Sequence, residues 1–153
     1  MSGFPGKTPS SGADHANGTE GAFLDTNVLI YLLSDNTLKA DIAQDLLRRG
    51  GVISVQVLNE FASVALRKTD LRLDEVREVL RGIRRFCRVE PLTIDTHELG
   101  LAYSARYRYS IHDSMILAAA TLAGCTTLMS EDLHAGQTIG TEIRIRNPFA
   151  AAH

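Results

Sequence analysis

The stretch Ala22–Leu33, AFLDTNVLIYLL, decides the expected fold of this chain. A short apolar run is followed by an acid at Asp25, two small polar residues and a second apolar run. This order is typical of a short buried strand, a tight turn and the start of a helix, with Thr26 or Asn27 as the expected helix cap. Asp25 is then expected at the carboxyl end of a strand, which is where open α/β sheets bind their ligands.

The length and composition favour one soluble globular domain. The chain has 153 residues, of which 44% are hydrophobic and 22% charged, and a chain of this size buries about two thirds of its surface on folding. The net charge of −2 gives no overall field that would attract nucleic acid. Any nucleic-acid binding must therefore depend on a local basic patch or on a bound metal.

The cysteine pattern and the apolar runs indicate a reduced, cytoplasmic protein. Cys87 and Cys125 are far apart and no CxxC occurs, so neither a disulfide framework nor a zinc site is indicated. The longest apolar run, 115–123, is too short to span a bilayer, and the N-terminus lacks the apolar segment of a signal peptide. Residues 1–20, rich in Gly and Ser, are expected to be a disordered tail, 21–149 the folded domain, and 150–153 a short C-terminal tail.

Apolar periodicity predicts strands that alternate with helices. Helices are expected over 38–49, 58–66, 73–88, 95–107 and through the apolar segment after Asp113, and short strands over 52–54, 89–92 and 126–129. Residues 141–146 alternate apolar and charged side chains and are expected to form an edge strand with one buried face. Alternating strands and helices imply right-handed crossovers and a mainly parallel sheet covered on both faces.

Acidic residues recur at strand ends and helix starts. Glu60 lies early in the helix after the second strand, and Asp113 lies in the first turn of the long apolar helix. The strand at 126–129 is followed immediately by Ser130-Glu131-Asp132, which repeats the order of apolar strand and then acid seen at Asp25. Asp132 is the better candidate to point inward, but its neighbour Glu131 is an alternative that the sequence leaves open. Each acid alone is commonly a solvated side chain or a helix-start residue favoured by the helix dipole.

Together these acids predict a metal site. Carboxylates that cluster without Lys or Arg between them repel one another, so some would have to stay protonated. A divalent cation removes this conflict, and oxygen-only ligands favour Mg²⁺ or Mn²⁺ over zinc. Such an ion can activate water and neutralise a phosphodiester under attack. The sequence contains no P-loop, GxGxxG or Ser–His–Asp set.

A row of arginines offers a possible contact for RNA. The residues recur at helical spacing over 73–88, on another face from the apolar positions of that segment, and are Arg77, Arg81, Arg84, Arg85 and Arg88. A basic stripe of this kind can hold backbone phosphates. It can equally be a solvated helix face that Glu75 and Glu78 partly neutralise, and the sequence does not decide between the two.

Four segments resemble a known family. FLDTNVLIYLL with Asp25, VLNEFASVALRK with Glu60, YSIHDSMILAAATLAGCTTLMSEDL with Asp113 and Asp132, and the ending IRIRNPF occur in family-like order and spacing. The sequence resembles a PIN-domain ribonuclease and, within that family, the toxin of a VapBC-type toxin–antitoxin pair. The resemblance extends over the chain from about residue 22 to 149 and leaves out the N-terminal tail.

The resemblance implies a three-layer α/β/α sandwich and Mg²⁺- or Mn²⁺-dependent cleavage of single-stranded or structured RNA. Asp25 and Asp113 would bind the metal directly, Glu60 would bind it or orient the attacking water, and Asp132 would support a second ion or act through water. The polar residues beside them, Asn27, Ser130 and Glu131, would hold these acids in place. The resemblance also implies homodimers and a cognate antitoxin that covers the acidic site.

Three other functions are compatible with parts of the pattern. A phosphotransferase of the haloacid-dehalogenase kind also has an Asp after its first strand, but it needs a second Asp where Asn27 stands and a Lys before the final acids, and no Lys follows Lys68. A PIN nuclease that processes RNA without being a toxin fits the same residues. A catalytically inactive PIN-like module that binds RNA or a protein partner is disfavoured, because all four acids are intact.

Overall fold

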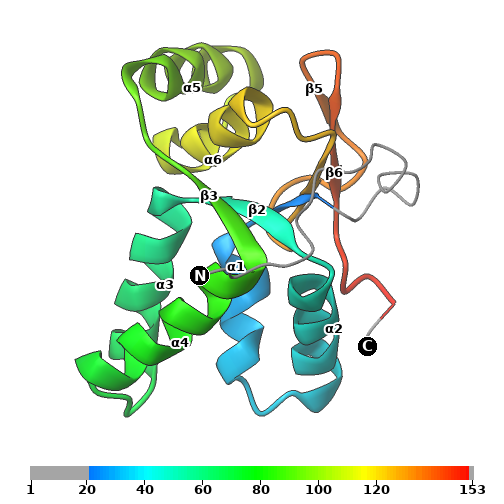
Figure 1. Ribbon diagram of the computed structural model, residues 1–153. Helices are drawn as coiled ribbons and strands as arrows, with labels where there is room; N and C mark the ends of the chain where they lie inside the picture. Colours follow the sequence, from blue (N-terminus) through cyan, green and yellow to red (C-terminus); the bar gives the residue numbers. More distant parts are fainter. Residues whose placement is uncertain (1–20, 152–153) are drawn as a thin grey trace.

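A six-stranded sheet forms the centre of the molecule (Figure 1). The structure, a computed structural model, describes residues 21–151. The strands are β1 Phe23–Leu24, β2 Gly51–Ser54, β3 Cys87–Glu90, β4 Thr127–Met129, β5 Thr138–Ile139 and β6 Ile143–Arg146, and their order across the sheet is β3-β2-β1-β4-β6-β5. All neighbouring strands are parallel except β5, which pairs antiparallel with β6.

Helices cover both faces of this sheet. They are α1 Thr26–Leu29, which continues as the 3-10 turn η3 Ile30–Leu33, then α2 Thr37–Arg48, α3 Val55–Lys68, α4 Leu73–Phe86, α5 Ile94–Tyr107 and α6 Ile111–Leu122. Figure 1 shows α1 to α4 on one side of the sheet and α5 with α6 on the other. The expected three-layer α/β/α sandwich with a mainly parallel sheet is thus confirmed.

The core lies between these layers and fixes the strand ends. Phe23 of β1, Ile53 of β2, Leu128 of β4 and Ile145 of β6 are fully buried. Helix α6 buries residues 116–120 continuously, as expected for a helix packed inside a domain rather than along its surface. Because β1, β2 and β4 are parallel and neighbouring, their carboxyl ends meet at one edge of the sheet.

The predicted helix over 73–88 is too long. Helix α4 ends at Phe86, and Cys87 and Arg88 belong to β3, where they pair with Gly51 and Val52 of β2. Cys87 continues the apolar spacing of the helix by coincidence, since its burial comes from the sheet. Pairing with β2 outweighs the local helical pattern at this boundary, which periodicity alone cannot resolve.

The predicted edge strand lies inside the sheet. Residues 143–146 form β6 with alternating buried and exposed side chains, as expected, but β6 is placed between β4 and β5. The edge is β5, a strand of only Thr138 and Ile139 that is too short to give a periodic signal. Both of its residues pair antiparallel with β6, so β5 protects the polar backbone of that strand.

Two expectations are not decided by this fold. The tail predicted over 1–20 lies outside the described residues, and the domain boundaries at 20/21 and 149/150 stay predictions. Among residues 21–151, no helix combines the length and the apolar character needed to cross a membrane.

Replacing two helical glycines with alanine is expected to change the stability of the protein in opposite directions. An added Cβ at Gly100 of α5 would lie 2.5 Å from Sδ and 2.8 Å from Cε of Met115 on α6, whereas one at Gly82 of α4 meets nothing within 4 Å. We therefore expect Gly100→Ala to lower the free energy of unfolding by less than about 1 kcal/mol, because the flexible end of Met115 can move aside at part of the cost of overpacking. Gly82→Ala should raise it by about 0.5–1 kcal/mol, because Ala restricts the unfolded chain.

Urea unfolding of the two glycine variants beside the wild type measures both effects. Stabilisation by both substitutions would show that helix propensity, and not the close approach of α5 to α6, controls the Gly100 position.

Candidate active site

Asp25 is fixed at the junction between β1 and α1. Its carboxylate is 6% exposed. Oδ1 accepts from the backbone N–H of Thr26 at 2.7 Å, so Asp25 itself caps α1, in place of the predicted Thr26 or Asn27. The helix begins directly after the strand, and this leaves Thr26 already inside the helix. Oδ2 accepts from the Ser130 hydroxyl at 2.9 Å and from Nδ2 of Asn27 at 3.3 Å.

Ser130 and Asn27 connect the ends of two neighbouring strands. Ser130 follows β4 and is fully buried, and its Oγ donates to Asp25 while accepting from Nδ2 of Asn27 at 3.2 Å and from the N–H of Asp132 at 3.2 Å. Oδ1 of Asn27 accepts from the N–H of Glu131 at 2.9 Å. These bonds hold the turn after β4 against Asp25, so both residues lie where the sequence predicted supporting groups.

Glu60 is held by Thr26, which was expected only as a helix cap, and by Gln56, which was not predicted as a site residue. Thr26 Oγ1 donates to Oε1 of Glu60 at 2.9 Å, and Gln56 Nε2 donates to Oε2 at 3.1 Å. The buried Gln56 also donates to the carbonyl oxygen of His112 at 2.9 Å, beside Asp113. Its spacing of four residues before Glu60 places both on one face of α3, and this was the available signal.

The four predicted acids line one cavity. Asp113 lies half-buried in the first turn of α6, where its N–H donates to Oγ of the cap Ser110 at 3.1 Å, and Asp132 is exposed in the turn after β4. Together with Asp25 and Glu60 they border a cavity of about 460 Å³. Its other lining residues are Thr26, Asn27, Ile30, Ser63, Val64, Arg67 and Lys68.

Burial and mutual repulsion raise the carboxyl pKa values. The pKa of Asp25 is raised from its ordinary 3.8 to about 6, chiefly because burial disfavours the charged form. Hydrogen bonds from Ser130 and Thr26 oppose the rise, and the charges of Asp113 and Glu60 add to it. The pKa of Asp113 is also raised, first by burial and then by Glu60 and Asp132.

The four carboxylates of the cavity are the kind of ligand that a hard divalent cation prefers. Four carboxylates supply oxygen ligands only, and a cation between them would relieve the repulsion that raises the pKa values of Asp25 and Asp113. Their side chains surround the cavity and do not converge on one point. Within residues 21–151, no three His, Cys, Asp or Glu side chains are arranged as a complete metal site.

Glu131 is directed to a different place from Asp132. Its Oε2 pairs with Nζ of Lys39 at 2.6 Å, and its Oε1 accepts from the Tyr31 hydroxyl at 2.7 Å. The Lys39 ammonium lies over the rings of Tyr31 and Phe149, 4.9 and 5.5 Å from their centroids. Asp132 lines the cavity and Glu131 does not. The geometry therefore favours Asp132 as the fourth acid, with Glu131 holding the turn that carries it.

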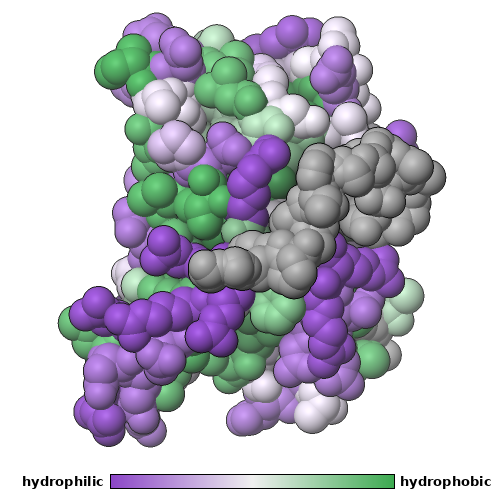
Figure 2. Space-filling view, viewed as in Figure 1, coloured by the Kyte–Doolittle hydropathy of each residue, from purple (hydrophilic) through white to green (hydrophobic). Residues whose placement is uncertain are grey.

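The predicted arginine stripe lies outside this cavity. Arg77, Arg81, Arg84 and Arg85 are exposed on α4 and Arg88 is exposed on β3. Arg81 pairs with Glu78 at 2.7 Å and Arg88 with Glu90 at 3.0 Å. Figure 2 shows the hydrophilic surface over α4. Contact between this stripe and RNA stays a prediction.

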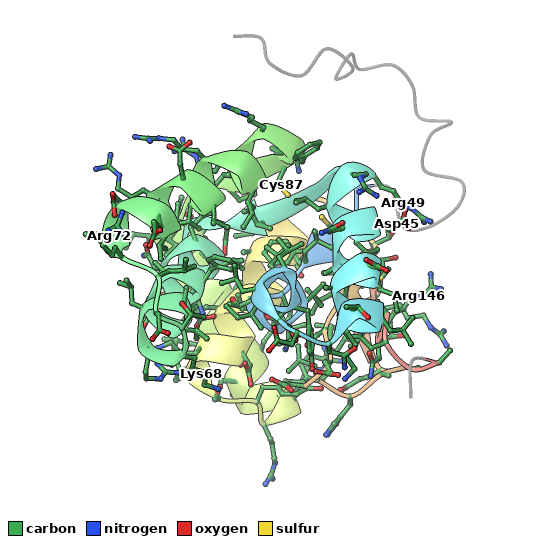
Figure 3. The ribbon with its side chains drawn as sticks, turned by 90° about the horizontal axis from the view of Figure 1, so that it is seen from below. Asp45, Arg49, Lys68, Arg72, Cys87 and Arg146 are labelled. Atoms are coloured by element: carbon green, nitrogen blue, oxygen red, sulfur yellow. The ribbon has the colours of Figure 1, made fainter. Side chains whose placement is uncertain are left out.

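The cations that do line the cavity are Arg67 and Lys68, in the last turn of α3. Neither residue was predicted from the sequence to lie at the site, although they follow Glu60 by seven and eight residues and therefore share its helix face. Figure 3 shows Lys68 well apart from Arg72, which precedes α4.

Solved structures with the same fold include toxin–antitoxin proteins. A chain of a toxin–antitoxin complex from Klebsiella pneumoniae is 20% identical, with a TM-score of 0.64, and the match covers 84% of this chain and 98% of that one. The sarcin–ricin loop cleaving toxin VapC20 of Mycobacterium tuberculosis is 21% identical, with a TM-score of 0.57 and coverage of 71% and 87%. VapBC2 of Rickettsia felis, bound to a promoter DNA fragment, is 16% identical, with a TM-score of 0.59 and coverage of 82% and 97%.

A comparison with curated protein sequences found no match. The family model described as the PIN domain matches residues 22–138, a segment that begins just before β1 and contains all four acids of the cavity. Because this match extends over more than half of the chain, and the fold agrees with it, the protein belongs to the PIN domain family.

Proposed function

We propose that the protein is a Mg²⁺- or Mn²⁺-dependent endoribonuclease and the toxin of a VapBC-type toxin–antitoxin pair. The observation that carries this proposal is the group of four acids, Asp25, Glu60, Asp113 and Asp132, around one open cavity of a PIN domain. The toxins among the solved structures of the same fold support the biological role.

The four acids are expected to have different roles in the reaction. Asp25 and Asp113 would hold the ion, and Glu60 and Asp132, which line the same cavity, would bind it or act on water. When bound, such an ion neutralises the phosphodiester and lowers the pKa of a water molecule. Both oxygens of Asp25 and both of Glu60 receive hydrogen bonds, so these two carboxylates are already oriented before any ligand binds.

Glu60 and Asp132 differ in what they can do to water. The half-buried Glu60 has fixed oxygens and is suited to orient an attacking water. Asp132 is exposed, so its carboxylate can support a second ion or act through a water molecule. The backbone N–H of Asp132 is tied to Ser130, which also donates to Asp25, and this links the two acids through one hydroxyl.

The partners follow from the same proposal. One of the similar solved structures is described as a toxin–antitoxin complex, another as a toxin that cleaves the sarcin–ricin loop, and a third as VapBC2 bound to a promoter DNA fragment. We propose that a cognate antitoxin covers the acidic cavity of this protein and that the chain forms a homodimer. We propose a cytoplasmic location, where thiols stay reduced, which suits the buried thiol of Cys125.

A cleavage assay with purified protein tests the proposal. We expect single-stranded or structured RNA to be cut in Mg²⁺ or Mn²⁺ and to stay intact in EDTA, and expression of the protein to arrest growth. Asp25→Ala provides the inactive control in both assays. The absence of cleavage with either metal would refute the nuclease, and cleavage without growth arrest would instead indicate a PIN nuclease that is not a toxin.

A further inference from the structure

One wall of the cavity changes from acidic to basic along α3. The residues that this helix contributes are Glu60, Ser63, Val64, Arg67 and Lys68. Their spacing of three, four, seven and eight residues places all of them on one helix face. At about 1.5 Å per residue, the two cations lie roughly 11 Å along the helix axis from Glu60. The α3 wall of the cavity therefore has an acid at one end, the base, and two positive charges at the other end, the rim.

Arg67 and Lys68 take part in none of the ion pairs found among residues 21–151. Both side chains are exposed. Side chains on a helix lean toward its N-terminus, and for this pair that is the direction of Glu60 and the acidic base of the cavity. Their charges are thus available to a ligand that enters the cavity.

A second pair of cations at a helix end, Arg48 and Arg49, provides a comparison away from the cavity. Arg48 and Arg49 end α2 as Arg67 and Lys68 end α3, and cations at a helix C-terminus interact favourably with the helix dipole. Arg49 pairs with Asp45 at 2.8 Å, and Arg48 donates to Gln44 at 3.4 Å. Neither residue lines the acidic cavity. The pair on α3 is distinguished by its place on that cavity.

We infer that Arg67 and Lys68 bind a backbone phosphate of the RNA beside the bond that is cut. The inference rests on the proposed nuclease function of the same cavity. A cavity with four acids repels a polyanion, and the net charge of −2 provides no compensating attraction. Two cations at the rim supply it locally, by binding a phosphate next to the one that reacts.

The test compares two double variants in RNA binding without metal. Arg67→Gln with Lys68→Gln and Arg48→Gln with Arg49→Gln remove the same charge from equivalent helix ends. Binding of a short single-stranded oligoribonucleotide is measured by fluorescence anisotropy in EDTA over a range of salt. We expect the first variant to lose affinity on the order of 10-fold near 0.1 M salt, and its log–log salt slope to become shallower by about 0.7, since one phosphate contact is lost. The second variant should bind like the wild type.

The cleavage assay adds an independent readout. With metal present, the Arg67/Lys68 variant should show a raised KM and a nearly unchanged kcat, because a phosphate away from the reacting bond is bound equally in the ground and transition states. Arg67→Lys with Lys68→Arg, which keeps both charges, should restore binding.

Three results would overturn the inference: unchanged binding, equal losses in both double variants, or a loss found only when Arg81 and Arg85 on α4 are replaced. A wild-type protein that binds the oligonucleotide but cuts no RNA would instead contradict the proposed function. The binding of the two double variants in EDTA could still be compared, because that measurement does not depend on cleavage.

Discussion

Asp113→Asn is expected to slow RNA cleavage by about 10²–10³-fold without unfolding the protein. Asp113 borders the cavity with Asp25 and Glu60, and its loss would remove a negative ligand from the place where the ion is proposed to bind. The substitution keeps the shape of the side chain. It also keeps the backbone N–H that bonds to the cap Ser110, so the start of α6 stays intact. Single-turnover cleavage rates in Mg²⁺ and thermal unfolding measure the two effects separately.

Asp95→Asn is the matched control for this variant. Asp95 lies in the first turn of α5, as Asp113 lies in the first turn of α6, but it does not line the acidic cavity. Any general effect of removing a helix-start charge is therefore shared by both variants. Asp95→Asn should cut RNA like the wild type. Nearly full activity in Asp113→Asn, or a comparable loss in Asp95→Asn, would show that Asp113 has no special part in the chemistry.

Local sequence rules were sufficient to place the acids. Asp25 directly follows an apolar run, and Asp113 precedes another by two residues, so each position is set by a strand end or a helix start. Parallel order then brings the carboxyl ends of β1, β2 and β4 to one edge. The gathering of Asp25, Glu60, Asp113 and Asp132 around one cavity depends on little beyond these two rules.

Contacts between distant segments were not predictable in the same way. The choice between Glu131 and Asp132 depends on Lys39 and Tyr31, which are 92 and 100 residues from Glu131. Gln56 acquires its role by reaching His112, 56 residues away. Contacts between residues this far apart produce no repeating pattern in a single sequence, so they could not be predicted from it. Arg67 is a different case, because its helical spacing from Glu60 was visible but meaningful only once α3 was known to line the cavity.

Without metal, the wild-type protein is expected to lose stability as the pH rises from about 4 to about 6. The pKa of Asp25 is raised from 3.8 to about 6, so the folded state binds this proton more tightly than the unfolded state does. Stability must then be greatest below the lower value and fall until the folded carboxyl is ionised. Over that window the loss amounts to about 3 kcal/mol for a group as buried as Asp25. Asp113, whose pKa is also raised, acts in the same direction.

Asp25→Asn isolates this contribution from the other titrating groups. An amide carries no charge and is as good a helix cap as a carboxylate, so the variant should lack the fall between pH 4 and 6 that Asp25 causes. Its amide nitrogen cannot accept from Ser130 and Asn27, which bond to Oδ2 in the wild type, so the gain near pH 7 should be smaller than 3 kcal/mol by about 1 kcal/mol or more. Urea unfolding in EDTA at several pH values measures the difference.

With metal bound at neutral pH, the wild type should become at least as stable as Asp25→Asn. Mn²⁺ that binds only the folded carboxylates stabilises the wild type by mass action, and it should stabilise Asp25→Asn much less. If the free energies of unfolding of the two proteins in EDTA change with pH in the same way, burial does not raise the pKa of Asp25. The expected result is that Asp25→Asn is the more stable protein in EDTA near pH 7 and that Mn²⁺ removes or reverses this difference. The fold would then keep a buried negative charge at position 25 for a cation to bind, at a cost to its own stability.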